Sequence, residues 1–497
     1  MTPEMMIWVS LLMPLVAFVL VWLFGNQPNI REACSIATSI ILFGITCVLA
    51  NHVFAGNRPE WNLGTMMPGF DISFQVEPLG MVFALVASGL WILTTIYAIG
   101  YMRGHNETNQ TRFFSCFAVA IFAALSAAYA KNLFTLFVAY EVMTISTYPL
   151  VTHHGNEKAK QGGRVYLGIL LSTSVAFFML AVAWTWNVAG TLDFKPGGIL
   201  TAAQLSGKIT NFQLAVLLGL FVYGIGKAAL MPFHRWLPAA MVAPTPVSAL
   251  LHAVAVVKVG VFSVLKVVVY IFGIDLIQLT QVGELGQYGM SSWLCYIAGA
   301  TILLASLVAM TKDNLKARLA YSTISQLAYI TLAAGLATPD SVIGGGMHIV
   351  MHAVGKITLF FCAGAIYVGA HKTDISDMRG LGRAMPLTFG AFFIASLSII
   401  GVPPCGGSWS KWFLAIATVD EGHLWLTATL MISSLLNIAY LIPISVRAFM
   451  TPAGMEPMKF KEAPMMCVVP LCITAVGSVA LFFFAEGIWN ALLPIVQ

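Results

Sequence analysis

Long apolar segments recur along the whole chain, separated by short polar stretches. Most run for roughly 17 to 25 residues, enough for a helix to cross about 30 Å of hydrocarbon. Because the interior of a membrane offers backbone groups no water, these segments are expected to be helices, and lipid-facing sheets are excluded. The pattern predicts fourteen spans, at 5–24, 34–53, 78–99, 113–130, 132–152, 163–187, 211–231, 244–270, 292–311, 317–336, 342–369, 385–402, 408–448 and 464–487.

The composition of the chain agrees with a membrane protein. Of 497 residues, 59% are hydrophobic and only 9% are charged, which excludes a water-soluble globule. We therefore predict an all-α polytopic membrane protein. Its 8 cysteines are scattered, mostly inside apolar segments and without CxxC spacing. This distribution favours small buried thiols over a disulfide framework or an iron–sulfur site.

The distribution of Lys and Arg indicates the orientation, because positively charged loops stay in the cytoplasm. With the N-terminus outside, the outer loops hold only Arg58, Lys131, Lys195 and Lys208, and the inner loops hold most of the other basic residues. We therefore predict an inner (plasma) membrane protein with both termini facing the periplasm or the cell exterior. The same bias favours an even number of spans.

Charged side chains inside the apolar segments are few. They are Glu141, Lys227, Lys258, Lys266, Lys356 and Lys411. Glu141 follows Asn132 by nine residues, or about 13 Å along a helix, which places it near the centre of the bilayer. An unpaired charge there is costly, so we expect Glu141 to face a wet cavity or a basic partner such as Lys227. The alternative is a protonated or hydrogen-bonded glutamate with a structural role.

Two landmarks indicate an internal repeat. The stretch KNLFTLFVAYEVMTIS from Lys131 resembles KDNLKARLAYSTISQL from Lys312, an offset of about 182 residues. Lys227 and Lys411 differ by 184, and each lies beside a proline interruption. Transporters built from inverted repeats place their sites at such paired broken helices. We therefore predict two broken helices and two inverted five-helix repeats, at 113–290 and 291–450, preceded by transmembrane helices 1–3 at 1–112 and followed by a C-terminal transmembrane helix at 451–497.

His348, His352 and Lys356 recur every four residues in one apolar segment. Steps of four advance about 40° around a helix, so the three side chains form one stripe about 12 Å long. Since imidazole titrates near neutral pH, the stripe suits a chain of proton-exchanging groups. A metal or haem site and a purely structural stripe are the alternatives, although no acidic third ligand lies near and Lys356 would repel a cation.

Three further titratable residues are accessory candidates. His252 lies six residues before Lys258, so the two do not share a helix face, and His252 is either a relay group or a hydrogen-bonded core histidine. His234 follows Pro232 in the first break, where it anchors the loop or receives protons. Lys266 either continues the stripe of Lys258 or extends its amine toward the membrane interface.

Five motifs together carry a resemblance to a known family. They are GIGKAALMPFHRWLPAAMVAPTPVSALLHAVAVVKVG, KDNLKARLAYSTISQLAYI, HIVMHAVGKITLFFCAGAIY, DMRGLGRAMP and GVPPCGGSWSKW. Over about residues 74–450 the chain resembles the proton-conducting antiporter-like membrane subunits of respiratory complex I, of energy-converting membrane hydrogenases and of Mrp-type cation/proton antiporters. Within this family it is most similar to the D-type subunit of Mrp antiporters or its hydrogenase counterpart.

The resemblance implies roles for the matching residues and shows two departures. It implies that Glu141 is the family's essential glutamate of the fifth helix, Lys227 the lysine of the broken seventh helix and Lys258 the lysine of the eighth helix. It further implies that His348, His352 and Lys356 form the central relay and that Lys411 is the exit residue of the broken twelfth helix. Tyr140 stands where many relatives have Trp. Met241 stands where complex I relatives often carry His, which removes one cytoplasmic proton-entry group.

These observations predict an ion-translocating membrane subunit of a multisubunit Na⁺/proton antiporter, which conducts protons through its buried Glu, Lys and His residues. The alternatives are a proton-pumping subunit of a redox-driven complex and a membrane enzyme or haem scaffold using His348 and His352. We find no flavin, nucleotide, quinone or iron–sulfur motif, so we expect no cofactor or metal and assign redox chemistry to partners. The expected partners are other membrane subunits, protons, Na⁺ and the lipid bilayer, and no nucleic acid.

Overall fold

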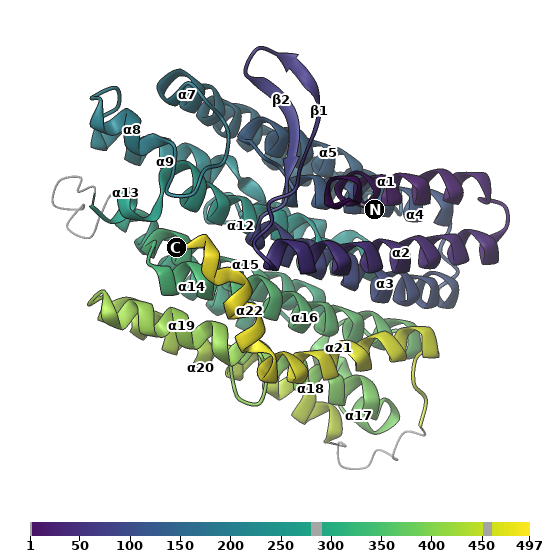
Figure 1. Cartoon of the computed structure of the whole chain (residues 1–497). Coiled ribbons are helices and arrows are strands. Elements are labelled where there is room, and N and C mark those ends of the chain that lie inside the picture. Colours follow the sequence, from purple (N-terminus) through teal and green to yellow (C-terminus); the bar gives the residue numbers. More distant parts are fainter. Residues whose placement is uncertain (1, 280–290, 451–459) are drawn as a thin grey trace.

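The computed structural model describes residues 2–279, 291–450 and 460–497, and these residues form one helical bundle (Figure 1). The elements of the first half are α1 (Pro3–Leu23), α2 (Pro28–Phe54), β1 (Glu60–Met67), β2 (Phe70–Gln75), α3 (Pro78–Gly104), α4 (Gln110–Ala128), α5 (Leu133–Val151), α6 (Glu157–Thr173), α7 (Met179–Ala189), α8 (Leu200–Leu205), α9 (Asn211–Gly224), α10 (Trp236–Ala239), α11 (Thr245–Ala249), α12 (Val256–Val267) and α13 (Ile274–Leu279). Those of the second half are α14 (Ser292–Thr311), α15 (Leu315–Leu336), α16 (Pro339–Ala370), α17 (Leu381–Ala384), α18 (Pro386–Ile400), α19 (Gly407–Asp420), α20 (Leu424–Phe449), α21 (Met465–Phe483) and α22 (Ala485–Leu492).

The predicted all-α membrane class is confirmed. Within the described residues, 12 helices are long and apolar enough to cross a membrane, counting α6–α7 and Thr245–Phe272 as continuous helices, and α9 and α18 are shorter apolar helices. The chain is therefore a multi-pass membrane protein. The number of fourteen spans stays a prediction.

The prediction that 408–448, with its preceding half-segment, forms one span is wrong. The chain forms two helices there, α19 and α20, which are separated by a turn at 421–423. Asp420 and Glu421 place charge at the end of α19, and Gly422 adopts a φ of +72°, which glycine reaches without steric cost. Hydropathy alone joined the two helices because the apolar residues on either side outweigh this short polar turn.

A β hairpin that the sequence did not predict lies between α2 and α3. Strands β1 and β2 are antiparallel, with Glu60 opposite Gln75, and Pro68 and Gly69 form the turn. The hairpin projects beyond the ends of the helices (Figure 1). Strand β2 is held by Asn132, whose side-chain amide donates to the carbonyl oxygen of Asp71 at 3.0 Å and to the hydroxyl of Ser73 at 2.9 Å. The hairpin therefore fixes the start of α5 at one end of the bundle.

The most enclosed part of the bundle consists of α11–α12, α15 and α16. These helices lie between α1–α5 on one side and α18–α21 on the other (Figure 1). The apolar window of Thr245–Phe272 is 100% buried, and those of α15 and α16 are 94% buried, whereas those of α1, α2 and α21 are 39% buried. Polar side chains on the three central helices are therefore shielded from lipid by protein.

The starts of α5 and α15 match each other closely. Asn132 and Asn314 cap these helices, and each side chain accepts a hydrogen bond from the backbone N–H three residues later. Each Asn also forms an isolated antiparallel bridge, Asn132 with Asp193 and Asn314 with Asp374. This agrees with the repeat offset seen in the sequence. The repeat boundaries stay a prediction, and 280–290 and 451–459, next to two of them, lie outside the described residues.

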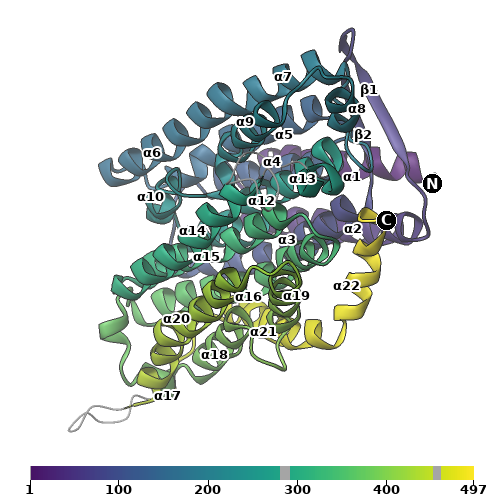
Figure 2. The same cartoon turned by 90° about the vertical axis from the view of Figure 1, so that its left-hand side faces the viewer.

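Both chain termini lie at the end of the bundle that carries the β hairpin (Figure 2). α5 begins beside the hairpin at Asn132 and runs away from it to Val151. The loop between α5 and α6 therefore lies at the opposite end of the bundle.

Candidate functional site

The first break in the bundle separates α9 from α10 and carries Lys227. α9 ends at Gly224, and a single 3₁₀ turn, Gly226–Ala228, follows it. This turn packs against α12 at Gly260, where a Cβ would lie 2.3 Å from the backbone carbonyl carbon of Lys227. Only glycine permits this approach of backbone to backbone. The break thus sets the fully buried Lys227 inside the bundle.

Gly260→Ala is expected to lower the free energy of unfolding by about 1–3 kcal/mol, because the added methyl group collides with the broken segment. The matched control is Gly168→Ala in α6, where a Cβ meets no atom within 4 Å. Thermal unfolding of the two purified variants in the same detergent measures the effect. Equal melting temperatures for both variants would show that the contact does not constrain the break.

The side chain of Lys227 is held by α5. Its Nζ donates to the carbonyl oxygen of Tyr140 at 2.8 Å and to the hydroxyl of Thr144 at 2.6 Å, and it lies 3.0 Å from the centre of the Tyr140 ring. The backbone N–H of Lys227 donates to the Tyr140 hydroxyl at 2.9 Å. Tyr140 therefore binds both the backbone and the amine of Lys227.

Glu141 lies next to Tyr140 on α5 but does not pair directly with Lys227. None of the ion pairs within 4.0 Å in the described part of the chain joins the two residues. Both carboxylate oxygens of Glu141 are buried without a hydrogen-bond partner among the described residues. Consecutive residues on a helix point about 100° apart, so Glu141 leaves α5 in a different direction from Tyr140. The direct contact suggested by the sequence is therefore not formed in this structure.

The predicted histidine stripe lies on α16, and its two histidines meet two other helices. Nδ1 of His352 lies 2.5 Å from Nζ of Lys258 on α12. Nδ1 of His348 lies 2.8 Å from the hydroxyl of Ser410 on α19. The two imidazole rings are stacked with their centres 5.7 Å apart. α16 thus connects α12 with the second broken region.

Lys356, the last residue of the stripe, reaches α15 instead. Its Nζ donates to the hydroxyl of Ser322 at 2.6 Å and to the carbonyl oxygen of Leu319 at 3.3 Å. The hydroxyl of Tyr440 on α20 donates to the same Ser322 hydroxyl at 3.0 Å. All the side-chain groups that Lys356 touches here are neutral.

The second break lies between α18 and α19, and Lys411 follows it on α19. Its Nζ donates to the carbonyl oxygen of Ile400 at 3.1 Å and to the hydroxyl of Ser434 at 3.3 Å, and it lies 4.8 Å from the centre of the Tyr329 ring. Gly401, with a φ of +93°, turns the chain at this point. As at the first break, a buried lysine binds a backbone carbonyl oxygen beside an aromatic ring.

The accessory candidates lie in three different places. His252 is fully buried, packs against Phe360 with ring centres 4.6 Å apart and ring planes inclined by 36°, and forms no hydrogen bond with the described residues. His234 lies in the first break, with its ring centre 6.3 Å from that of Tyr321. Lys266 forms an ion pair with Glu77 at 2.7 Å, at the hairpin end of the bundle.

Sequence reasoning missed the neutral groups that hold the charged ones. These are Tyr140, Thr144, Ser322, Ser410 and Tyr440. Hydroxyl residues are common in apolar helices, so their presence alone gives no signal. The signal in the sequence is their position close to the charged residues: Tyr140 and Thr144 lie on either side of Glu141, and Ser410 precedes Lys411.

The metal alternative receives no support from the arrangement of side chains. Within the described residues, no three His, Cys, Asp or Glu side chains lie together as metal ligands. The amine of Lys258 already contacts Nδ1 of His352, one of the two nitrogens through which that histidine would bind a metal. The arrangement suits proton exchange between neighbouring side chains.

Comparison with known families covers most of the chain. Residues 130–437 match the model of the NADH:quinone oxidoreductase/Mrp antiporter transmembrane family, and residues 65–114 match the model of the N-terminus of NADH-ubiquinone oxidoreductase (complex I) chain 5. NADH-quinone oxidoreductase subunit N of Desulforudis audaxviator is 27% identical over 98% of this chain and 96% of its own length. A probable K⁺/H⁺ antiporter A/B subunit of Rhizobium meliloti is 31% identical over 78% of this chain, but over only 37% of its own length.

Two solved structures share the fold over nearly the whole chain. A chain in the structure of the Mrp complex from Dietzia sp. superposes with a TM-score of 0.85 and 21% identity, covering 100% of this chain and 97% of that one. A chain of the membrane-bound sulfane sulfur reductase, an archaeal respiratory membrane complex, gives a TM-score of 0.84 and 22% identity, with 99% and 97% covered. Both are parts of multisubunit membrane complexes.

Proposed function

The chain belongs to the NADH:quinone oxidoreductase/Mrp antiporter family, and on this basis we propose that it is the ion-translocating membrane subunit of a multisubunit cation/proton antiporter. Other membrane subunits are its partners, as they are for the relatives. The proposed task of this chain is to carry protons across the bilayer in exchange for a cation, with Na⁺ as the first candidate. The probable K⁺/H⁺ antiporter among the relatives makes K⁺ the second.

The observation that carries this proposal is the contact between Lys258 and His352. Both side chains are buried, and their nitrogen atoms lie 2.5 Å apart on two different central helices. A proton on Lys258 Nζ can pass along this hydrogen bond to His352 Nδ1, and the histidine can release a proton from Nε2 on the other side of its ring. A contact with only a structural role could be made by apolar side chains, without the free-energy cost of burying two titratable groups.

The rest of the proposed path follows α16 toward the second break. The His348 ring stacks on that of His352 and contacts Ser410, the residue before Lys411. Buried polar atoms without partners in the described residues lie on α16 and on α15, which packs against it, among them Nε2 of both histidines and the amide of Gln326. Groups of this kind bind ordered water, which would bridge the steps that side chains do not span directly.

We assign the ends of the path to the two breaks. Lys227 forms one end, and Lys411 forms the other. Lys227 contacts Tyr140, and the buried carboxylate of Glu141 is the next residue along α5. Each break lies in one of the two proposed five-helix repeats. The matched caps and bridges of Asn132 and Asn314 support that repeat organisation.

The proposed location is the plasma membrane, with both termini outside. The common position of the termini at the hairpin end fits this orientation (Figure 2). Lys158, in the first turn of α6, and Lys372, in the connection after α16, lie at the opposite end, in agreement with the rule that positive loops stay inside.

A second candidate is the proton-pumping subunit of a redox-driven complex. It is favoured by the match over nearly the full length of NADH-quinone oxidoreductase subunit N. In such a complex this chain would move protons without a redox centre of its own. The same buried path serves both candidates, and the driving force distinguishes them.

Inverted membrane vesicles that contain the whole assembly test the proposal. A pH gradient is built up by ATP hydrolysis, without any electron donor, and followed with a pH-sensitive dye. We expect addition of NaCl or KCl to dissipate the gradient in these vesicles and not in vesicles that lack the assembly. If neither salt has an effect and the assembly acidifies the vesicles only when an electron donor is supplied, the redox-driven candidate replaces the antiporter.

A further inference from the structure

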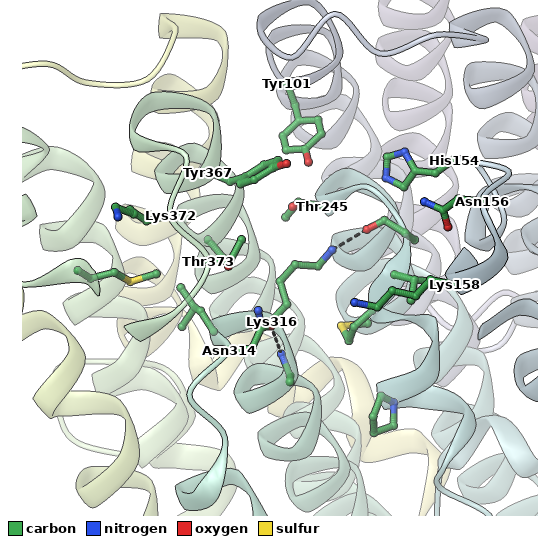
Figure 3. A pocket seen from close by; sticks show the side chains of 18 residues that line it. Tyr101, His154, Asn156, Lys158, Thr245, Asn314, Lys316, Tyr367, Lys372 and Thr373 are labelled. Atoms are coloured by element: carbon green, nitrogen blue, oxygen red, sulfur yellow. Dashed lines mark hydrogen bonds between the residues drawn. The ribbon is translucent and has the colours of Figure 1, made fainter. Parts of the chain in front are cut away.

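A separate cavity of about 550 Å³ opens at the end of the bundle opposite the β hairpin. The loop between α5 and α6, the α10 region, the start of α15 and the end of α16 surround it (Figure 3). Met241 also lines this cavity. None of the residues proposed for the proton path lines it.

The lining of this cavity is basic. Lys158, Lys316, Lys372 and His154 lie in its wall, together with several hydroxyl and amide side chains. None of the described residues that line it is Asp or Glu. Figure 3 shows the amines of Lys158 and Lys316 directed into the same space. The walls therefore offer many hydrogen-bond donors and a concentrated positive charge.

The carboxylates near the cavity do not line it, although Asp374 accepts a hydrogen bond from the side-chain amide of the lining residue Asn314 at 3.2 Å. Asp377 contacts Lys372 at 3.4 Å, and Glu157 contacts Lys160, outside the cavity, at 2.8 Å. In the described part of the chain, neither Lys158 nor Lys316 forms an ion pair within 4.0 Å. The amine of Lys316 donates to the carbonyl oxygen of Ala243, at 2.5 Å. Among the described residues, the amines of Lys158 and Lys316 are thus without an anionic partner.

His154, the remaining basic group, has one acidic neighbour. Its Nδ1 lies 3.6 Å from a carboxylate oxygen of Glu107. Glu107 does not line the cavity. The amines of Lys158 and Lys316 remain the basic groups of the lining that no carboxylate contacts among the described residues.

Two helix N-termini add to the positive potential. The capping residues of α6 and α15, Asn156 and Asn314, both line the cavity. These helices have 17 and 22 residues, long enough to present a partial positive charge at their starts. Helix starts and lysine amines together are the groups that bind phosphate in proteins.

We propose that this cavity binds a phosphate-bearing anion through Lys158, Lys316 and the starts of α6 and α15. A volume of about 550 Å³ is far larger than a halide ion needs and is within the range of small-molecule sites. The many separate donors suit an anion with several oxygen atoms. The phosphate belongs either to a soluble compound or to the headgroup of an anionic phospholipid at the membrane surface.

Titration of the intact assembly with inorganic pyrophosphate tests the site. The assembly is placed in phosphatidylcholine nanodiscs, and binding is measured by calorimetry at low and high KCl. We expect saturable binding that weakens with salt, and about tenfold weaker binding for Lys158→Gln, which removes one charge-assisted contact. The matched control, Lys160→Gln, changes a neighbouring lysine that is paired with Glu157 outside the cavity and is expected to bind as the wild type does.

Nanodiscs that also contain phosphatidylglycerol identify the source of the phosphate. If the lipid headgroup occupies the site, this lipid weakens pyrophosphate binding to the wild type and not to Lys158→Gln. If it leaves pyrophosphate binding unchanged, the ligand is a soluble phosphate compound. Absence of saturable pyrophosphate binding, or equal binding by Lys158→Gln and Lys160→Gln, would overturn the proposal.

Discussion

Lys258→Met is expected to reduce proton-coupled transport by about 100-fold or more while the assembly still forms. Methionine fills a similar volume but cannot bind or release a proton, so His352 loses the titratable partner at its Nδ1. Because the side chain is fully buried, no other described lysine can take its place without a change in packing. Dye quenching in inverted vesicles measures the transport rate, and a native gel measures assembly.

The control for this variant is Lys208→Met, which removes an exposed lysine from a loop. It is expected to transport as the wild type does. If fully assembled Lys258→Met also transports at the wild-type rate, the contact between Lys258 and His352 is structural, and protons take another route.

Glu141→Gln is expected to reduce transport to a similar extent. The ammonium of Lys227 touches only neutral groups, the carbonyl oxygen of Tyr140 and the hydroxyl of Thr144, so the nearest compensating charge is that of Glu141, one residue along α5. Glutamine keeps the shape of the side chain and removes this charge, and a positive Lys227 then becomes costly in the interior. Glu141→Asp keeps the charge and is expected to retain part of the activity.

Transport in these variants is measured over a range of pH, so that a shifted optimum is not mistaken for a loss. Glu421→Gln, in the exposed turn between α19 and α20, is the control and is expected to behave as the wild type does. Wild-type rates for assembled Glu141→Gln at every pH would mean that Lys227 does not depend on this carboxylate.

The sequence was sufficient to predict the features that depend on local chemistry. The thickness of the hydrocarbon fixes the length of an apolar span, so the helices and their approximate positions followed from hydropathy. The alignment of His348, His352 and Lys356 followed from the period of a helix. The interruptions at the two breaks were indicated by proline, because it cannot continue a helix.

The contacts between helices were not predictable in the same way. Lys258 and His352 are 94 residues apart in the chain, and Lys227 and Tyr140 are 87 apart. Which side chains meet depends on how the helices are rotated and shifted against each other, and that is decided by packing over the whole bundle. The sequence therefore suggested Glu141 for Lys227 by charge, whereas the packing placed Tyr140 and Thr144 there.

The arrangement around α16 has a consequence for control of the pathway. Each of its three titratable side chains is tied to a different neighbouring helix: His348 to α19, His352 to α12 and Lys356 to α15. A small displacement of one of these neighbours would lengthen one contact and leave the other two unchanged. Movement of α12, α15 or α19 can therefore interrupt a different proton-transfer step along α16, while α16 itself stays in place.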